Sequence, residues 1–210
     1  MIILLKLKSQ KKIFEELKLK DKKLIKILDS KKKCPFLLKP IIKEEFLFFE
    51  LAQSIVGQQI SAKAADAIWK RIISYSNNKK DFLIYIANSN LEWARKQGLS
   101  QRKHEYIKII AKNIILKKIS LVSVEKLNND DAIDFLISLK GVGPWTAEMF
   151  LMFAYRRIDV FSMGDIALRR AVSEIYEVDR NDFNKIKLIA DKWTPYRSLV
   201  CWYLWEYLGV

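Results

Sequence analysis

Residues 139–147 read Leu-Lys-Gly-Val-Gly-Pro-Trp-Thr-Ala, and this stretch decides the fold. Apolar residues recur at helical spacing both before and after it. Gly141 and Gly143 permit tight backbone geometry, and Pro144 suits the first turn of a following helix because its missing N–H is not needed there. Such a hairpin points backbone N–H groups outward, where a phosphate can bind. A Gly-x-Gly-Pro turn by itself is also compatible with an ordinary tight connection between helices.

An acidic residue, Asp165, stands 22 positions beyond Gly143. A phosphate-binding turn followed by a single carboxylate suggests chemistry performed on DNA. In such chemistry a nearby ionised carboxylate can stabilise developing positive charge or orient water. The alternative is that Asp165 only caps the helix predicted over residues 165–176. The two roles are compatible.

The composition indicates a folded protein with an anionic partner. Half of the 210 residues are apolar, and six glycines and four prolines leave no flexible linker, so one continuous, mostly helical body is expected. The formal net charge of +14 favours nucleic acid or an anionic surface. Residues 1–43 hold 14 lysines and four acidic residues, a balance of +10. A DNA-binding arm and plainly solvated helix faces explain this segment equally well.

Several other classes of protein are disfavoured. The apolar residues 1–5 are too few to span a membrane, so we expect an intracellular protein of the cytoplasm and nucleoid, or of a nucleus, without a membrane partner. Cys34 and Cys201 lie far apart and outside any Cys-x-x-Cys pair, which predicts buried, reduced thiols rather than a zinc or iron–sulfur site. His104, flanked by charged residues, is expected on an exposed helix face rather than in catalysis.

The apolar periodicity predicts an all-α fold. Two helical lobes are expected to pack around the helix-hairpin-helix motif, with an active-site cleft between them. A basic segment over residues 1–43 would pack on a body over 44–210, whose lobes cover about 44–130 and 131–210 plus the N-terminal part. The helices are predicted over residues 11–19, 21–29, 44–57, 60–76, 79–87, 90–97, 101–117, 121–126, 130–139, 144–155, 165–176, 182–191 and 195–207.

Four blocks of the sequence together resemble one known family. The hairpin at 139–147 with Asp159, Val160, Phe161 and Asp165 is similar to the helix-hairpin-helix and Gly/Pro-Asp signature of base-excision DNA glycosylases. Within that superfamily the chain resembles the 3-methyladenine glycosylases of the AlkA type. The other blocks, in family order, are SIVGQQIS at 54–61, GLSQRK at 98–103 and WTPYRS at 193–198. One departure is Lys140, which replaces the proline that usually precedes the first glycine.

The resemblance implies a monofunctional DNA glycosylase. Such an enzyme flips alkylated purines (3-methyladenine, 7-methylguanine) out of DNA and hydrolyses the N-glycosidic bond, which initiates base excision repair, and Asp165 would be the catalytic carboxylate. In bifunctional relatives a lysine lies two positions after the second glycine of the hairpin. Trp145 occupies that position here, so no amine is available to form a Schiff base. A glycosylase/lyase for oxidised bases and a non-catalytic helix-hairpin-helix DNA-binding protein remain the alternatives.

The resemblance also implies roles for further residues. Gln59 would fill the gap left by the extruded base, although Gln58 and Gln59 could instead satisfy nearby backbone groups. Trp202 could also be a core residue. The expected base pocket contains Trp145, Trp205, Trp202 and Met149. The expected DNA contacts are Gly141, Val142, Gly143, Lys140, Thr146, Gln59, Ser61, Lys63 and Arg102.

The expected partner is double-stranded DNA that contains damaged bases, and the protein is expected to act as a monomer. No organic cofactor is implied. The family's hairpin often binds a structural monovalent cation through backbone carbonyls, which by position would belong to Ile137, Leu139 and Val142. Backbone ligands leave no signature in the side chains, so the sequence itself does not test this site.

Overall fold

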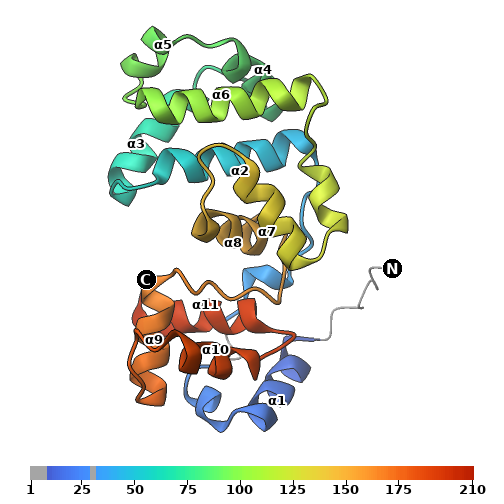
Figure 1. The fold of residues 1–210 in the computed structure, drawn as a ribbon, viewed down its shortest axis with the longest axis vertical. Helices are drawn as coiled ribbons and strands as arrows, with labels where there is room; N and C mark the ends of the chain where they lie inside the picture. Colours follow the sequence, from blue (N-terminus) through green and yellow to red (C-terminus); the bar gives the residue numbers. More distant parts are fainter. Residues whose placement is uncertain (1–8, 29–31) are drawn as a thin grey trace. The chain divides into compact units, whose positions relative to one another are not determined.

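The computed structural model describes residues 9–28 and 32–210. These residues form helices and the turns between them, and no β-strand occurs among them (Figure 1). The prediction of an all-α fold is therefore confirmed. Residues 1–8 and 29–31 of the predicted basic segment 1–43 lie outside the described residues.

The α-helices follow the apolar periodicity of the sequence closely. They are α1 (Gln10–Lys20), α2 (Glu44–Gly57), α3 (Ala62–Ile73), α4 (Lys79–Asn88), α5 (Leu91–Lys96), α6 (Gln101–Ile115), α7 (Asn129–Ser138), α8 (Pro144–Phe153), α9 (Ile166–Tyr176), α10 (Phe183–Asp191) and α11 (Arg197–Leu208). The described residues also contain the short 3₁₀ helices η1 (Lys22–Lys26), η2 (Pro35–Leu37) and η3 (Val122–Lys126). η1 replaces the α-helix predicted over 21–29, because the Asp21 carboxylate accepts the N–H of Lys23 at 3.1 Å and starts a tighter turn.

The chain divides into two compact units. The terminal unit combines residues Met1–Pro40 with Leu151–Val210, and the middle unit covers Ile41–Phe150. We expected the lobes to divide near residue 130, whereas the structure divides them within α8. The reason is that the hairpin before α8 is hydrogen bonded to the end of α2, where the Gln58 side chain donates to the Gly141 carbonyl at 3.0 Å.

The middle unit is built around α2. This helix packs against α3, α4 and α6, and α4 also packs along α6 (Figure 1). The buried face of α2 includes Phe48 and Leu51, and Phe48 lies 5.7 Å from Phe82 of α4 between ring centroids. Because apolar side chains cover most of α2, the helix can be enclosed on several sides.

His104 of α6 is buried, which corrects the expectation of an exposed helix face. Its side chain is 3% exposed and shares the inner face of α6 with the buried Ile107 and Ala111. The Ser89 hydroxyl donates to the Ile86 carbonyl at 2.8 Å, so the contact of 2.8 Å between Ser89 Oγ and His104 Nε2 is donated by the imidazole. The helical spacing, rather than the flanking charges, determines where this histidine lies.

The terminal unit joins the two ends of the described chain. α9 packs against α10 and α11, and α1 packs beside η1. The buried Asp21 carboxylate accepts hydrogen bonds from the Tyr176 hydroxyl at 2.6 Å and from the Trp193 indole at 3.2 Å. The Tyr196 hydroxyl donates to Glu16 at 2.9 Å. These bonds fix the N-terminal helices onto the C-terminal ones, because removing an acceptor would leave buried donors unsatisfied.

The pKa of His104 gives a prediction that a single NMR resonance can test, because His104 is the only histidine in the sequence. Burial, followed by the charge of Lys108, lowers this pKa from its usual value of 6.5. The folded protein then keeps the imidazole neutral at pH values where the unfolded chain is already protonated. The associated stability is present in full well above pH 6.5, the pKa of the unfolded chain, and is lost as the pH falls through and below that value.

We expect the NMR titration midpoint of His104 to lie below that of the urea-unfolded chain. The free energy of unfolding should fall between about pH 7.5 and about pH 5.5, and it should fall less in a His104→Gln variant. A folded-state midpoint at or above the unfolded one would contradict this prediction.

Candidate functional site

The hairpin between α7 and α8 requires glycine at position 141. Gly141 has a φ of 92°, and a Cβ atom there would lie 2.2 Å from Cδ2 of Tyr106. Both the backbone angle and the contact with Tyr106 therefore exclude a side chain. This glycine shapes the turn by letting the backbone lie directly against an aromatic ring of α6.

Gly143 has a different surrounding. A Cβ atom at this position would meet no atom within 4 Å, so the space beside Gly143 is open. α8 begins at the next residue, Pro144, and the N–H groups of a first helical turn have no carbonyl partner within the helix. A ligand can approach the backbone here, as the phosphate-binding prediction requires.

The other predicted hairpin residues divide into outward and inward side chains. Lys140 is exposed, and Trp145 is 46% exposed. Val142 is buried, and its N–H donates to the Leu139 carbonyl at 3.0 Å, so this N–H is used within the turn. Thr146 is also buried, and its hydroxyl accepts a hydrogen bond from Gln58 at 3.2 Å. The Thr146 side chain therefore holds the hairpin in place instead of reaching solvent.

The loop between α2 and α3 carries the next group of predicted residues. Gln59 is exposed and has a φ of 57°, in the left-handed region. Ser61 is exposed and caps α3 by accepting the N–H of Ala64 at 3.3 Å. Lys63 is exposed as well. Gln58 binds the hairpin, so of the two functions weighed for this glutamine pair, the backbone contact belongs to Gln58 and Gln59 faces outward.

Two residues of α6 complete this surface of the middle unit. Arg102 is exposed, and its guanidinium lies 6.0 Å from the ring centroid of Tyr106, which itself lies against Gly141. Lys103 donates to two backbone carbonyls at the end of α2, those of Val56 at 2.8 Å and Gln58 at 2.6 Å. The hairpin, the α2–α3 loop and the start of α6 are thus connected within one unit.

Asp165 belongs to the terminal unit and is the N-cap of α9. Its Oδ1 accepts the N–H of Leu168 at 2.9 Å and lies 3.4 Å from the indole nitrogen of Trp205. Both donors are N–H groups, so the carboxylate acts as their acceptor. The cap and the catalytic role that the sequence suggested can therefore coexist in one side chain.

Aromatic rings adjoin this carboxylate. Trp205 is half-buried and stacks on Phe153, with ring centroids 5.8 Å apart and planes at 27°. Phe153 also packs edge-on against Phe36 at 5.0 Å. Trp202 lies edge-on to the core residue Tyr203 at 4.6 Å. Met149, which the sequence also assigned to the base pocket, belongs to the middle unit and is buried there. Packing against the core therefore accounts for the position of Trp202, whereas the Trp205 indole directly contacts the Asp165 carboxylate.

The residues WTPYRS at 193–198 hold the chain segment that leads to Asp165. Arg197 forms a bidentate ion pair with Asp159, with Nε–Oδ1 at 2.8 Å and Nη2–Oδ2 at 3.1 Å. The hydrogen bond to Asp159 is the largest cause that raises the pKa of Arg197 above its usual value, and the negative charges of Asp159 and Asp191 raise it further. The buried Ser198 hydroxyl accepts the N–H of Val160 at 2.8 Å and donates to its carbonyl at 3.0 Å. This block therefore positions the loop that carries Asp165.

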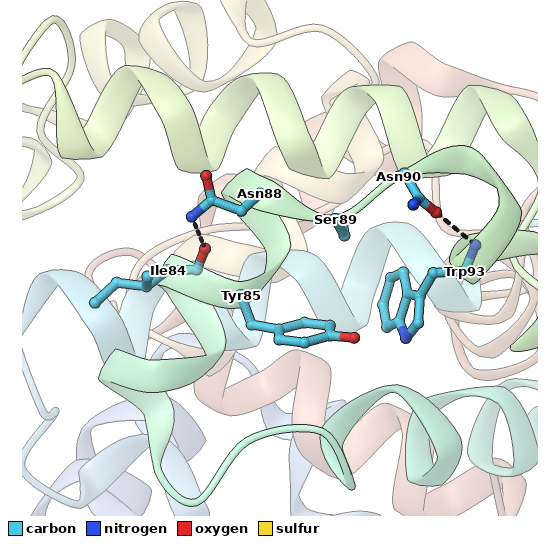
Figure 2. Close-up of a pocket in the computed structure, with 6 residues that line it drawn as sticks. All are labelled: Ile84, Tyr85, Asn88, Ser89, Asn90 and Trp93. Atoms are coloured by element: carbon cyan, nitrogen blue, oxygen red, sulfur yellow. Dashed lines mark hydrogen bonds between the residues drawn. The ribbon is translucent and has the colours of Figure 1, made fainter.

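A cavity of about 350 Å³ in the middle unit involves none of the predicted site residues. Its amides are used within the fold: Asn88 donates to the Ile84 carbonyl at 2.9 Å, and Asn90 accepts the N–H of Trp93 at 2.8 Å (Figure 2). The cavity thus lies beside the turn between α4 and α5. It is lined by Ile84, Tyr85, Asn88, Ser89, Asn90 and Trp93.

Three residues without a predicted role contact predicted site residues or their backbone within their own unit. They are Tyr106, Lys103 and Phe153. A signal existed for Lys103, because it closes the GLSQRK block, but its partners in α2 are visible only in the fold. Among the described residues, no cluster of His, Cys, Asp and Glu is arranged to hold a metal ion. No helix in the described part of the chain is long and apolar enough to cross a membrane.

Comparison with known proteins identifies the family. A model of the HhH-GPD superfamily of base excision DNA repair proteins matches residues 52–195. The chain belongs to this superfamily. The matched HhH-GPD region includes the α2–α3 loop, the start of α6, the hairpin and Asp165, so the resemblance drawn from the sequence blocks is confirmed.

Individual relatives agree with this placement. The chain is similar to DNA-3-methyladenine glycosylase 1 of Schizosaccharomyces pombe, with 32% identity over 160 residues that cover 75% of this chain and 70% of the relative. It is also similar to the crystal structure of a DNA-3-methyladenine glycosidase from Bacillus halodurans, with a TM-score of 0.78, 30% identity and coverage of 94% and 89%. A Schizosaccharomyces pombe 3-methyladenine DNA glycosylase in complex with abasic DNA gives a TM-score of 0.76, 28% identity and coverage of 95% and 97%.

The two hairpin glycines should respond differently to alanine. Gly141→Ala places a Cβ atom 2.2 Å from Tyr106, so we expect it to lower the free energy of unfolding by about 1–3 kcal/mol in urea titrations. Gly143→Ala should change stability by less than about 0.5 kcal/mol. It should nevertheless weaken binding to duplex DNA in fluorescence anisotropy, because a methyl group obstructs the open backbone.

Each variant serves as the control for the other. Equal destabilisation by both substitutions would contradict the assignment of the packing role to Gly141. Unchanged DNA binding by Gly143→Ala would contradict the phosphate contact at the start of α8.

Proposed function

We propose that this protein is a monofunctional DNA glycosylase that releases alkylated purines from double-stranded DNA. The observation that carries the proposal is the N-cap carboxylate of Asp165 in contact with the indole of Trp205, in a chain of the HhH-GPD superfamily. The names of its similar relatives, which are 3-methyladenine glycosylases, support this substrate class. Within the class, 3-methyladenine and 7-methylguanine are the bases that we propose.

The proposed chemistry needs one carboxylate. As the base–sugar bond lengthens, positive charge develops on the sugar, and the negative charge of Asp165 stabilises it or orients the attacking water. The N–H groups of Leu168 and Trp205 hold this carboxylate in one direction. A purine alkylated on a ring nitrogen is already cationic, so it leaves without much assistance from a general acid.

Aromatic side chains suit a cationic base. Indole rings attract a flat cation through stacking and cation–π interactions, worth about 0.5–2 kcal/mol each. We assign this contact to Trp205 and Trp145, with Phe153 supporting the Trp205 ring from one side. Trp202 and Met149 are assigned secondary roles, because one lies against a core tyrosine and the other is buried.

DNA binding is assigned to the middle unit. The backbone at Gly143 and the first turn of α8 would bind a phosphate, with Lys140, Ser61, Lys63 and Arg102 as further contacts. Gln59 would enter the space left by the extruded base. The proposed monovalent cation would bind the backbone carbonyls of Ile137, Leu139 and Val142, the first two of which lie at the end of α7. The Leu139 carbonyl already accepts the N–H of Val142 at 3.0 Å, and its second lone pair would face the cation.

The first prediction from this function concerns Asp165. Asp165→Asn keeps a side chain that can cap α9 but removes the negative charge, so release of 3-methyladenine or 7-methylguanine from methylated DNA should fall by about 100-fold or more. Binding to duplex DNA with an abasic site should persist in a gel-shift assay.

Asp182→Asn is the matched control, because Asp182 caps α10 of the same unit by accepting the N–H of Lys185 at 3.0 Å. It should retain activity. Full activity of Asp165→Asn would refute the catalytic role, and DNA binding without base release by the wild type would favour the non-catalytic alternative.

A second prediction separates hydrolysis from lyase chemistry. A lyase forms a Schiff base between an amine and the sugar, which borohydride reduces to a stable adduct. Because Trp145 occupies the position of the lysine nucleophile, borohydride should trap no complex of this protein with lesion-containing DNA on a denaturing gel. A glycosylase/lyase treated in parallel supplies the positive control, and a trapped adduct of this chain would establish the lyase alternative.

A further inference from the structure

The α2–α3 loop presents Gln59 in an uncommon backbone conformation. Its φ of 57° lies in the left-handed region, which residues other than glycine rarely adopt. Such a backbone angle persists where the surrounding contacts determine it. The contacts on either side of Gln59 therefore set the direction in which this exposed side chain leaves the loop.

Lys103 binds the peptide group between Gln58 and Gln59. Its ammonium group donates to the Gln58 carbonyl at 2.6 Å and to the Val56 carbonyl at 2.8 Å. The Gln58 carbonyl and the N–H of Gln59 belong to one planar peptide group, so fixing the carbonyl fixes the plane. The lysine reaches this group from the first turn of α6, 45 residues further along the chain.

The end of α2 explains why a lysine is suited to this position. α2 ends at Gly57, and its last carbonyls have no N–H partner within the helix. A positive charge also interacts favourably with the negative end of a helix. Partial burial lowers the pKa of Lys103, as expected for an amine that has exchanged water for protein partners. The Ser100 hydroxyl caps α6 by accepting the N–H of Lys103 at 3.4 Å, and this bond fixes the position of the Lys103 backbone.

Gln58 connects the same loop to the hairpin. While its backbone carbonyl binds Lys103, its side-chain amide donates to the Gly141 carbonyl at 3.0 Å and to the Thr146 hydroxyl at 3.2 Å. One residue thus links α6, the loop and the hairpin. The outward direction of Gln59 is fixed relative to the backbone that is proposed to bind phosphate.

We propose that Lys103 is a positioning residue for base extrusion. By holding the Gln58–Gln59 peptide, it directs Gln59 into the space that the flipped base leaves while the hairpin binds the DNA backbone. This inference rests on the proposed function, in which Gln59 is the space-filling residue. Without the ammonium group, the loop keeps its link to the hairpin through Gln58 but loses the fixed direction of Gln59.

The test compares Lys103→Met with Gln59→Ala and with a matched control. Lys103→Met retains an apolar stem and loses the donor. The control is Lys108→Met, which also removes a lysine of α6 that donates to a backbone carbonyl, here that of Ser89, remote in sequence from the α2–α3 loop. Single-turnover base release is measured at saturating enzyme on two duplexes with the same alkylated purine. The purine is fully paired in one duplex, and it lies in a one-nucleotide bulge in the other.

We expect Lys103→Met and Gln59→Ala to slow release from the paired duplex by about tenfold and from the bulge by less than about twofold, because the bulged base needs little help to leave the helix. The double variant Lys103→Met/Gln59→Ala should release the paired base at a rate within about twofold of that of Gln59→Ala alone, since both changes remove the same function. Lys108→Met should match the wild type on both duplexes.

A second readout does not depend on chemistry. In a duplex with 2-aminopurine beside an abasic-site analogue, the wild type should change the fluorescence on binding, and Lys103→Met should lose that change while still binding. Equal slowing on paired and bulged substrates would show a general structural role and overturn the inference, as would wild-type behaviour of Lys103→Met on both. If the wild type releases no alkylated base yet shows the fluorescence change, the proposed function fails, and loss of that change in Lys103→Met still supports the positioning role.

Discussion

Backbone groups at the helix ends are the constraint on which this structure depends. A fold made of helices and short turns leaves N–H and C=O groups at each terminus that need partners. Asp165 supplies one at the start of α9, Ser61 supplies one at the start of α3, and Lys103 supplies two at the end of α2. The residues with assigned functions gather at helix ends because polar side chains are needed there and the backbone there is open to a ligand.

The helix ends have a different function in each of the two units. In the terminal unit the requirement is a fixed carboxylate, and the Arg197–Asp159 ion pair together with the Ser198 contacts to Val160 holds the loop before Asp165. In the middle unit the requirement is an accessible backbone, which the open space beside Gly143 provides. A rigid acid and an accessible turn are what hydrolysis of a sugar–base bond and phosphate binding respectively demand.

The helices could be predicted from the sequence because their evidence is local. Apolar spacing and cap residues lie within the segments they describe, and Asp165 could be expected to cap α9 for this reason. The same spacing also places His104, Ile107 and Ala111 on one face of α6, and that face is buried. Flanking charges led to the opposite expectation, since adjacent residues of a helix point to different sides.

The partners of the site residues could not be predicted, because they depend on how the helices pack. Nothing near Lys103 in the sequence indicates the Val56 and Gln58 carbonyls, which become neighbours only when α6 packs on α2. Phe153 likewise meets Trp205 only through packing within the terminal unit. A motif can therefore show that a lysine or tryptophan stands in a family position, but the chemistry of that position follows from which backbone or carboxylate the fold brings to it.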